Sequence, residues 1–335
     1  MTMTFDRRRF LMLSAAGLAL PLMPGLARAE EAALSEGAKA VGGAVAAQGA
    51  APKPLRIAVL SFQGSSFWEA ADKGIAAAAD YLKPLNTTVD YIQLGTGLTA
   101  EVMVAGIDGA LTKQYDGIAA VPIFDGTVAK VNEVVAEGVP FVSFIADSAE
   151  KSNRTVSIGM LAYDAGAKAG EFMAKQLGGK GKIAVITGYL GAAQHDARMN
   201  GALDLIKKNY PDITIVGPFE CKDDDATAYS QATDVMTSNP DLSILYVTAG
   251  GSEAAAKAVR DSKATGKVGV VGYDDLPEKQ QYKDGGEILA LIDQAPARQA
   301  FDSIVMLHNM LGFGATYPAD IAVDAPIALG KGAKT

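Results

Sequence analysis

The hydrophobic pattern is regular from Leu55 onward, where short continuous apolar runs alternate with longer amphipathic segments. Continuous apolar runs are typical of strands buried on both faces, and apolar positions spaced by three or four are typical of helices. Gly138 is placed to end one such helix in a left-handed conformation. The pattern predicts strands over 55–60, 88–92, 117–121 and 140–144, and helices over 67–82, 100–113 and 126–137.

The same alternation restarts in the second half of the chain. Two successive runs of this kind predict two similar α/β lobes, each with a parallel sheet covered by helices on both faces. A long helix over 297–311 follows, and the apolar stretch 321–329 predicts one final strand. The second run predicts strands over 182–187, 214–216, 243–247, 268–273 and 290–294, and helices over 163–177, 192–210, 227–238 and 252–262.

The first 53 residues stand apart from this pattern. Arg7-Arg8-Arg9, an apolar stretch to about Leu26 and the small-x-small sequence Ala27-Arg28-Ala29 follow the order of a secretory signal peptide, which we place at 1–29. The basic cluster resembles a twin-arginine signal, and general secretion is the alternative. Residues 30–53 are rich in Ala, Gly and Glu, which predicts a flexible leader.

The charge balance disfavours several classes of partner. The chain carries a formal net charge of −8. Removing residues 1–29 takes away four basic residues and one acid, which leaves 26 basic against 37 acidic residues and a net charge of −11. Nucleic acids and anionic lipids are bound by basic faces, so this balance argues against both partners.

Cysteine and histidine usage limits the chemistry further. Cys221 is the single cysteine, so no disulfide can form within the chain. His195 and His308 are the two histidines, and they lie far apart without the spacing of metal ligands. No cofactor fingerprint appears in the sequence, and we expect no cofactor.

The loop after the first predicted strand carries two adjacent aromatic residues, Phe67 and Trp68. In open α/β sheets, ligands bind at the carboxyl ends of the strands, where this loop lies. A flat ring can stack on the apolar face of a sugar or polyol. We expect one of the two rings to face a ligand and the other to pack in the core.

Two carboxylates follow later strands of the first half. Asp125 precedes a predicted helix, where it can cap that helix or contact a ligand. Asp147 follows the strand that ends at Phe144. A carboxylate there suits two vicinal hydroxyls, and the alternative is a turn residue that binds its own backbone.

Polar residues follow the strands of the second half as well. Gln194, Asp196 and Arg198 lie in or near the first turn of a predicted helix, within reach of a ligand. His195 has no paired acid and nucleophile, so catalysis by it is not expected. Asp274 and Gln294 lie at strand ends, and their planar polar groups suit sugar hydroxyls.

From Leu55 to about Leu329 the chain resembles the ribose-type periplasmic sugar-binding proteins of ABC importers. Each matching feature is weak alone, but their order and spacing over nearly all of the mature chain are specific. These features are Phe67-Trp68, Ser143-Phe144…Asp147, Gly191…Arg198-Met199-Asn200-Gly201, Val271-Gly272-Tyr273-Asp274, and Asp284-Gly285 followed by Gln294-Ala295-Pro296.

The resemblance implies the type I periplasmic binding protein fold, with two Rossmann-like lobes joined by a three-strand hinge that close on a ligand. It implies an N-terminal lobe of 54–160 plus 295–322 and a C-terminal lobe of 161–294 plus 323–335. It also implies docking onto an inner-membrane ABC permease. The ligand contacts it implies are Phe67, Trp68, Asp147, Arg198 or a neighbour on its helix, Asp274 and Gln294.

Two segments depart from the family. Members often carry Asp-Asn after the Ile-Gly of the first crossover, where this chain has Met160-Leu161-Ala162. Many also carry Asn-Asp where this chain has Thr248-Ala249-Gly250-Gly251. Two polar anchors are therefore absent, so the ligand is less hydroxylated than a common hexose, partly apolar, or placed differently.

These observations favour a periplasmic, non-enzymatic receptor for a sugar or sugar alcohol. The same fold can also bind a non-sugar metabolite, or signal to a membrane chemoreceptor or sensor kinase. An exported enzyme could use Asp147 and Asp274 as an acid/base pair. A transcriptional regulator would need a basic helix-turn-helix before the first strand, and residues 1–53 offer none.

Overall fold

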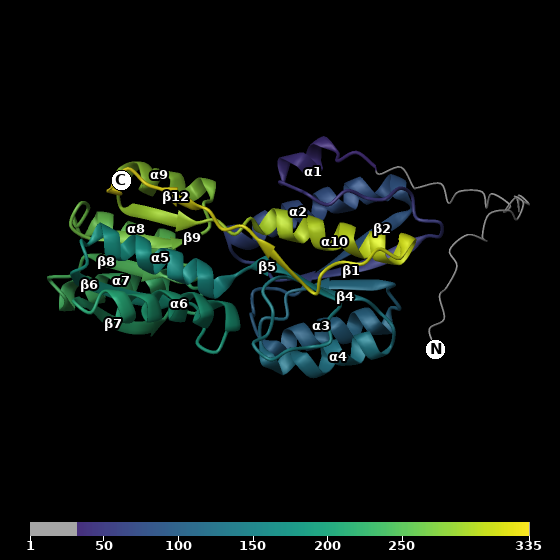
Figure 1. The fold of residues 1–335 in the computed structure, drawn as a ribbon, viewed down its shortest axis with the longest axis horizontal. Coiled ribbons are helices and arrows are strands. Elements are labelled where there is room, and N and C mark those ends of the chain that lie inside the picture. Colours follow the sequence, from purple (N-terminus) through teal and green to yellow (C-terminus); the bar gives the residue numbers. More distant parts are fainter. Residues whose placement is uncertain (1–31, 335) are drawn as a thin grey trace, which may run out of the picture. The chain divides into compact units, whose positions relative to one another are not determined.

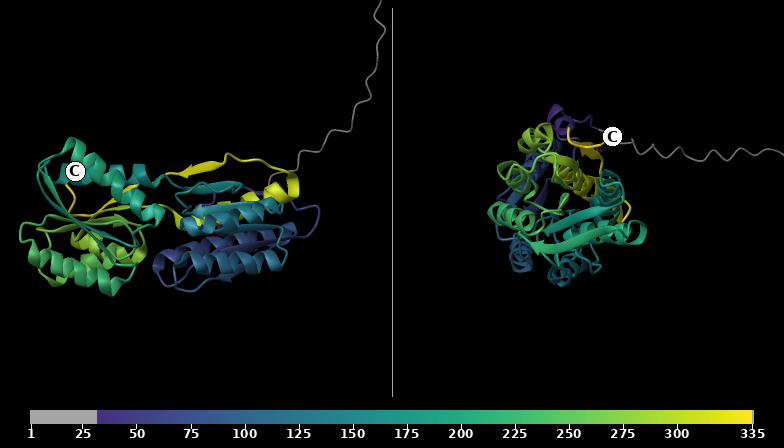
Figure 2. Two further views of the ribbon diagram at one scale, coloured as in Figure 1. Left: turned by 90° about the horizontal axis from the view of Figure 1, so that it is seen from below. Right: turned by 90° about the vertical axis from the view of Figure 1, so that its left-hand side faces the viewer.

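Two six-stranded sheets organise residues 32–334, the range that the computed structural model describes. The predicted signal peptide and its twin-arginine motif lie outside the described residues. Each sheet belongs to one lobe, and helices cover both faces of each sheet (Figures 1 and 2). The two α/β lobes predicted from the alternating pattern are confirmed.

The N-terminal lobe has the strand order β11-β5-β4-β3-β1-β2, with every neighbouring pair parallel. α2 and α10 cover one face of this sheet, and α3 and α4 cover the other (Figure 1). The strands are β1 (Leu55–Ser61), β2 (Thr87–Gln93), β3 (Gly117–Ala120), β4 (Phe141–Ile145), β5 (Val156–Met160) and β11 (Asp320–Val323). The helices are α1 (Glu36–Ala40), α2 (Ser66–Leu82), α3 (Ala100–Thr112), α4 (Val128–Ala136) and α10 (Pro296–Phe313), with 3-10 turns η1 (Lys83–Leu85) and η2 (Asp125–Thr127).

The C-terminal lobe has the order β12-β10-β9-β8-β6-β7, parallel except for the antiparallel edge strand β12. One apolar core lies under α5 and α6, and another lies under α7 and α8. The strands are β6 (Gly181–Thr187), β7 (Ile213–Glu220), β8 (Ile244–Val247), β9 (Gly269–Tyr273), β10 (Ile288–Ile292) and β12 (Ile327–Leu329). The helices are α5 (Ala162–Gln176), α6 (Ala193–Asn209), α7 (Asp225–Ser238), α8 (Ser252–Asp261) and α9 (Gln280–Gly285), with the 3-10 turn η3 (Pro277–Lys279).

The chain passes between the lobes three times: after β5, after β10 and after β11. The prediction of a single strand over 321–329 is wrong, because this stretch forms two strands in different sheets. β11 pairs with β5 in the N-terminal lobe, and β12 pairs with β10 in the C-terminal lobe. The turn between them holds Asp324 and Pro326, and the carbonyl of Pro326 accepts a bond of 3.0 Å from the Asp293 amide.

The described part of the predicted flexible leader, residues 32–53, packs on the N-terminal lobe. Ala38 and Ala47 are fully buried against this lobe. Asp302 of α10 accepts hydrogen bonds from the Ala44 and Val45 amides at 2.8 and 2.9 Å. The side-chain amide of Asn309 in α10 accepts a bond from the Gln48 amide and donates one to the Ala46 carbonyl. Small apolar residues and buried polar partners therefore order this segment without bulky side chains.

Glycines allow α5 and α6 to pack closely, which fixes the helix that carries Arg198. A Cβ atom added at Gly166 of α5 would overlap the backbone carbonyl of Arg198. A Cβ atom added at Gly201 of α6 would overlap the carbonyl of Tyr163. The two helices can approach this closely only because both positions lack a side chain.

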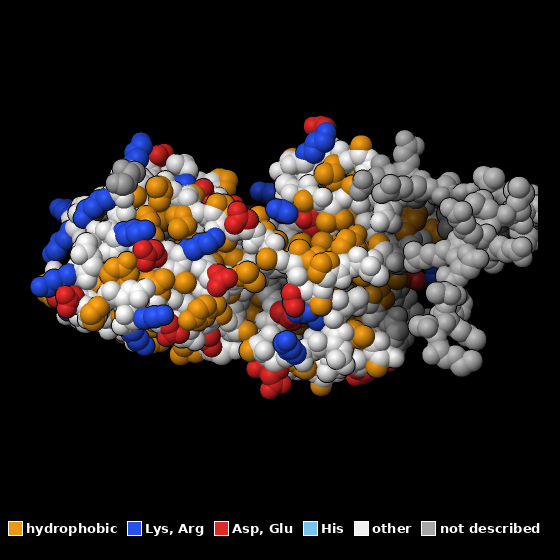
Figure 3. All heavy atoms as spheres, in the orientation of Figure 1, with side chains coloured by type: hydrophobic (Ala, Val, Ile, Leu, Met, Phe, Trp, Pro, Cys, Tyr) orange, Lys and Arg blue, Asp and Glu red, His pale blue; other side chains and the backbone are white. Residues whose placement is uncertain are grey.

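The face of the C-terminal lobe drawn in Figure 3 shows side chains of both charges. On the face in Figure 3, acidic and basic side chains are interspersed over the C-terminal lobe. None of the helices within residues 32–334 combines the length and apolar character needed to cross a bilayer.

Candidate functional site

A cavity of about 300 Å³ is lined by residues of both lobes. Its walls come from loops at the carboxyl ends of parallel strands, which is where open α/β sheets place their ligand sites. Six of the nine side chains predicted as ligand contacts line it. These are Phe67, Trp68, Gln194, Arg198, Asp274 and Gln294.

Phe67 and Trp68 open α2 and both line the cavity, each partly exposed. Their rings meet edge to face with centroids 5.0 Å apart. The expectation that one of them packs in the core is wrong, because Phe62 takes that place. Its ring is 1% exposed and lies 5.6 Å from the Trp68 ring. The cavity therefore has an aromatic surface supported from behind by a third ring.

A chain of buried hydrogen bonds joins three of the predicted contacts. An Nη atom of Arg198 donates to Oε1 of Gln294 at 2.8 Å, and Nε2 of Gln294 donates to Oδ1 of Asp274 at 2.7 Å. The guanidinium of Arg198 also lies over the Tyr273 ring, 4.3 Å from its centroid. All three residues are less than 5% exposed. These contacts hold the amide and the carboxylate in fixed orientations, which suits them to bind hydroxyl groups of defined geometry.

Further hydrogen bonds join Gln294 and Gln194 to Ile145, at the end of β4. Gln299 of α10 donates to the carbonyl of Gln294 at 2.6 Å, and its Oε1 accepts from the Ile145 amide at 2.8 Å. Gln194 of α6 donates to the carbonyl of Ile145. Gln194 of the C-terminal lobe is thus bonded to the end of β4 in the N-terminal lobe, and Gln299 joins the same point to Gln294 on the segment that crosses after β10.

Backbone strain accompanies these bonds. Ile145, Asp274 and Ala295 have φ angles of 68°, 67° and 52°, in the left-handed region. This conformation is unfavourable for side chains with a Cβ atom, and most of all for a β-branched one. Such strain gathers at ligand sites and switch regions, and here two of the three residues line the cavity.

Sequence reasoning missed an acidic part of the C-terminal wall. Asp223, Asp224 and Asp225 follow β7, Glu253 lies in α8, and all four line the cavity. The pKa of Asp225 is raised mainly by burial, and the pKa of Glu253 is raised by burial and by nearby carboxylates. The strand-end rule that located Asp274 applies equally to β7, but the prediction ended that strand at residue 216.

Lys279 and His195 also line the cavity. Lys279 is 6% exposed and donates to the carbonyl of Tyr273 at 2.8 Å. Nδ1 of His195 accepts a bond of 3.1 Å from the Tyr189 amide, which places any proton of the neutral ring on Nε2. Burial lowers the pKa of His195, so the ring is neutral at pH 7.

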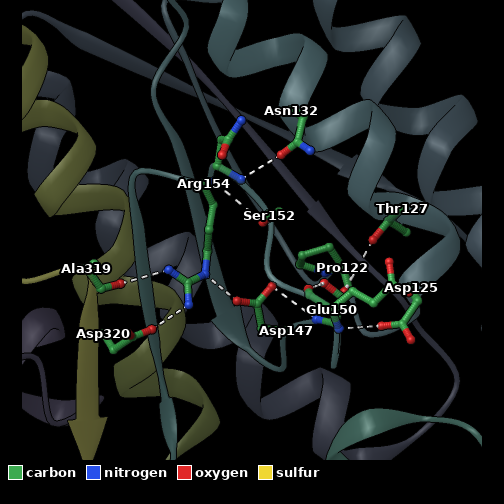
Figure 4. Close-up of polar contacts among 12 residues, drawn as sticks. Pro122, Asp125, Thr127, Asn132, Asp147, Glu150, Ser152, Arg154, Ala319 and Asp320 are labelled. Atoms are coloured by element: carbon green, nitrogen blue, oxygen red, sulfur yellow. Dashed lines mark hydrogen bonds and ion pairs between the residues drawn. The ribbon is translucent and has the colours of Figure 1, made fainter.

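Asp125, Asp147 and Asp196, also predicted as ligand contacts, do not line this cavity. Asp147 forms an ion pair with Arg154, which also pairs with Asp320 (Figure 4). Asp125 accepts a bond of 2.8 Å from the Glu150 amide (Figure 4), and Asp196 accepts one of 2.9 Å from the Gly191 amide. Asp147 also accepts a bond of 3.1 Å from the Ser148 amide, as the alternative of a turn residue that binds its own backbone predicts.

Within residues 32–334, no group of three or more His, Cys, Asp or Glu side chains is placed to hold a metal ion. The polar side chains that line the cavity carry carboxylates, amides, two hydroxyls, an imidazole and two cations. Groups of these kinds can bind uncharged hydroxyl-bearing molecules through directional hydrogen bonds, and an aromatic pair can cover an apolar face.

Comparison with known proteins gives a consistent result. Residues 57–315 match a family model described as periplasmic binding protein domain. The D-allose-binding periplasmic protein of Escherichia coli K12 is 28% identical over 273 residues, which covers 79% of this chain and 86% of that protein. A xylitol-binding protein of Mycolicibacterium smegmatis is 26% identical over 162 residues, 48% of this chain and 44% of that protein. The crystal structure of GanP, a glucose-galactose binding protein from Geobacillus stearothermophilus, superposes with a TM-score of 0.75 at 25% identity, covering 82% of this chain and 97% of that one.

Proposed function

This chain belongs to the periplasmic binding protein family, and on that premise we propose that it captures a sugar or sugar alcohol between its two lobes. The observation that carries the proposal is the cavity in which an aromatic pair and the bonded set Arg198, Gln294 and Asp274 lie together. The names of the relatives that bind D-allose and xylitol support the same ligand class.

Capture would work by closure of the lobes on the ligand. Gln194 bonds the C-terminal lobe to the strained Ile145 of the N-terminal lobe, and Gln299 bonds Ile145 to Gln294 on the crossing segment, so a ligand there can change the balance between lobe arrangements. Direct contact of the ligand with Phe67, Trp68, Gln194, Arg198, Asp274 and Gln294 is part of this proposal.

We propose binding without turnover. The acid/base pair considered from the sequence, Asp147 and Asp274, is not assembled in the cavity, because Asp147 pairs with Arg154 outside it. Nδ1 of the buried His195 accepts a hydrogen bond from the Tyr189 backbone amide rather than from a nucleophilic side chain. These contacts suit a receptor better than an acid/base site.

The partner of the ligand-bound form would be an inner-membrane ABC permease, with export to the periplasm by a twin-arginine signal. The relative named a D-allose-binding periplasmic protein supports the compartment. Delivery of a signal to a chemoreceptor or sensor kinase remains the second candidate, since lobe closure can be recognised by either kind of partner.

The test is calorimetric binding of D-allose, D-ribose, xylitol and D-galactose to residues 30–335. We expect at least one of them to bind in a saturable manner, and Asp274→Ala to weaken it by tenfold or more, because a buried partner of Gln294 is lost. Asp234→Ala, on the exposed surface of α7, is the control and should bind as the unaltered protein does. If no sugar or polyol binds, the proposed ligand class is wrong. If the recovered ligand is chemically changed, the proposal of binding without turnover is wrong.

A further inference from the structure

The two walls of the cavity differ in chemical character. Every charged side chain that lines it belongs to the C-terminal lobe. The N-terminal wall offers Ser65 and Ser66 as its polar side chains, and the rest of that wall is apolar or glycine. The apolar side chains that line the cavity from this lobe and keep some exposed surface include Phe67, Trp68, Leu98, Ile123 and Ile145.

The N-terminal lobe has carboxylates nearby, but they are held out of the cavity. Figure 4 shows Asp147 directed at Arg154, which also binds Asp320 and donates to the Ala319 carbonyl at 2.9 Å. Asp125 holds the Glu150 amide of the same loop. The loop between β4 and β5 is therefore fastened to β11 and to the start of α4. These contacts keep Asp125 and Asp147 out of the cavity, which leaves this wall without a charged side chain.

The opposite wall is polar and acidic. Its charged side chains are five acids (Asp223, Asp224, Asp225, Glu253 and Asp274) and two bases (Arg198 and Lys279). The formal charge of this wall is −3 when His195 is neutral. Both bases already donate to protein oxygens. An anionic ligand would meet net repulsion here, whereas hydroxyl groups can donate to the carboxylates.

From these two walls we propose that the ligand is a neutral, partly deoxygenated sugar or polyol. Its methyl or methylene edge lies against Leu98 and Ile123, and its hydroxylated edge faces the carboxylates. A hydroxyl placed against these two side chains would lose its bonds to water without replacement, whereas a C–H group there gains from burial. This inference rests on the proposed function, since it specifies the ligand of the same cavity.

The test compares each parent sugar with its monodeoxy analogues. Calorimetry gives dissociation constants for D-allose, D-galactose, D-glucose and D-ribose, and for their 2-deoxy forms and, for the hexoses, their 6-deoxy forms. For the parent that binds most tightly, we expect one monodeoxy analogue to bind at least tenfold more tightly. The corresponding sugar acid should bind at least tenfold more weakly than the parent.

A variant on the apolar wall locates the effect. Ile123→Thr places a hydroxyl on this wall and should reduce the deoxy preference at least threefold. The matched control is Ile118→Thr, a fully buried residue of β3 that does not line the cavity, and it should leave the preference unchanged. Leu98→Thr provides a second variant on the same wall if Ile123→Thr does not fold.

The outcomes separate the two proposals. If sugars bind but every monodeoxy analogue binds equally or more weakly than its parent, this inference is overturned and the receptor proposal stands. An unchanged preference in both wall variants likewise overturns it. If no neutral carbohydrate binds, the receptor proposal fails, and this inference fails with it.

Discussion

Arg198 makes three different contacts through one planar side chain. Its guanidinium donates to Gln294 and to the Thr248 carbonyl at 3.0 Å, and it stacks on Tyr273. A lysine has a single ammonium group, so it cannot donate to both oxygens and stack on the Tyr273 ring at the same time. The orientation of the Gln294 amide therefore depends on this arginine.

Arg198→Lys should weaken ligand binding by about tenfold or more, equivalent to about 1.4 kcal/mol. The matched control is Arg260→Lys. Arg260 stacks on Tyr282 at the same distance of 4.3 Å and pairs with Glu287, but it does not line the cavity. Both variants should lower stability in urea titrations, and only Arg198→Lys should change the dissociation constant. Equal affinities in calorimetry would contradict the role given to Arg198.

Cys221 should be an unreactive thiol in the native protein. It is fully buried beside the Gly250 carbonyl, and burial raises its pKa to about 12. The thiolate is the reactive form, so its fraction at pH 8 is very small. A chromogenic disulfide reagent should label Cys221 rapidly when the protein is unfolded in about 6 M guanidinium. It should label the native protein far more slowly. Rapid labelling of the native protein would show that the segment after β7, which holds Cys221, opens readily.

At the scale of elements, glycine positions decide how closely α5 and α6 can pack. Gly166→Ala should destabilise the protein by about 1–3 kcal/mol, because the new methyl group overlaps the backbone of Arg198 and packing must shift. It should also weaken ligand binding, because α6 carries Arg198 and Gln194. Gly109→Ala in α3 is the control. A Cβ atom there meets nothing within 4 Å, so the protein should gain up to about 1 kcal/mol of helix stability. Urea denaturation of both variants measures the difference.

The alternating pattern predicted most helices and strands because each buries a periodic apolar face in its own lobe. It failed where an element depends on distant partners. β7 continues to Glu220 beyond Gly217 and Pro218, which is possible because β7 is an edge strand where a missing amide costs no ladder bond. Ending this strand at residue 216 hid the acidic residues that follow it from the analysis of strand ends.

The remaining errors also arise from contacts between residues far apart in sequence. Asp147 was expected at the ligand, but it pairs with Arg154, which is also held by Asp320, and nothing local to residue 147 reveals Asp320. The leader looked flexible because it lacks bulky apolar residues, yet Asp302 and Asn309 of α10 bind its backbone. The predicted contacts Asp274 and Gln294 line the cavity because they follow the ends of β9 and β10, where topology fixes their position.

At the scale of the whole molecule, two buried histidines link stability to pH. His195 lies in the cavity wall of the C-terminal lobe, and His308 of α10 contacts Thr87 and the Gly49 carbonyl in the N-terminal lobe. Burial is the main cause that lowers the pKa of each below its usual value near 6.5. Each lobe therefore contains one neutral imidazole that is costly to protonate in place.

Proton linkage determines whether the unfolding free energy rises or falls with pH. Below pH 6.5 the unfolded chain binds a proton at each histidine before the folded protein does, so the unfolded state is favoured as the pH falls. The stability contributed by these residues is complete above pH 6.5 and is lost as the pH falls through the lowered pKa values. Asp225, Glu253 and Asp293 have raised pKa values and act in the opposite sense, so the total curve mixes both contributions.

A variant isolates the histidine contribution, because the carboxylates are common to both proteins. We expect the unfolding free energy of the unaltered protein to fall more steeply between pH 7 and 5 than that of His308→Gln. Glutamine keeps hydrogen-bonding groups near Thr87 and Gly49 but does not titrate. Urea denaturation at a series of pH values gives both slopes. Parallel curves would mean that His308 does not resist protonation in the folded state, and a shallower slope in the unaltered protein would mean that the folded protein stabilises the charged ring.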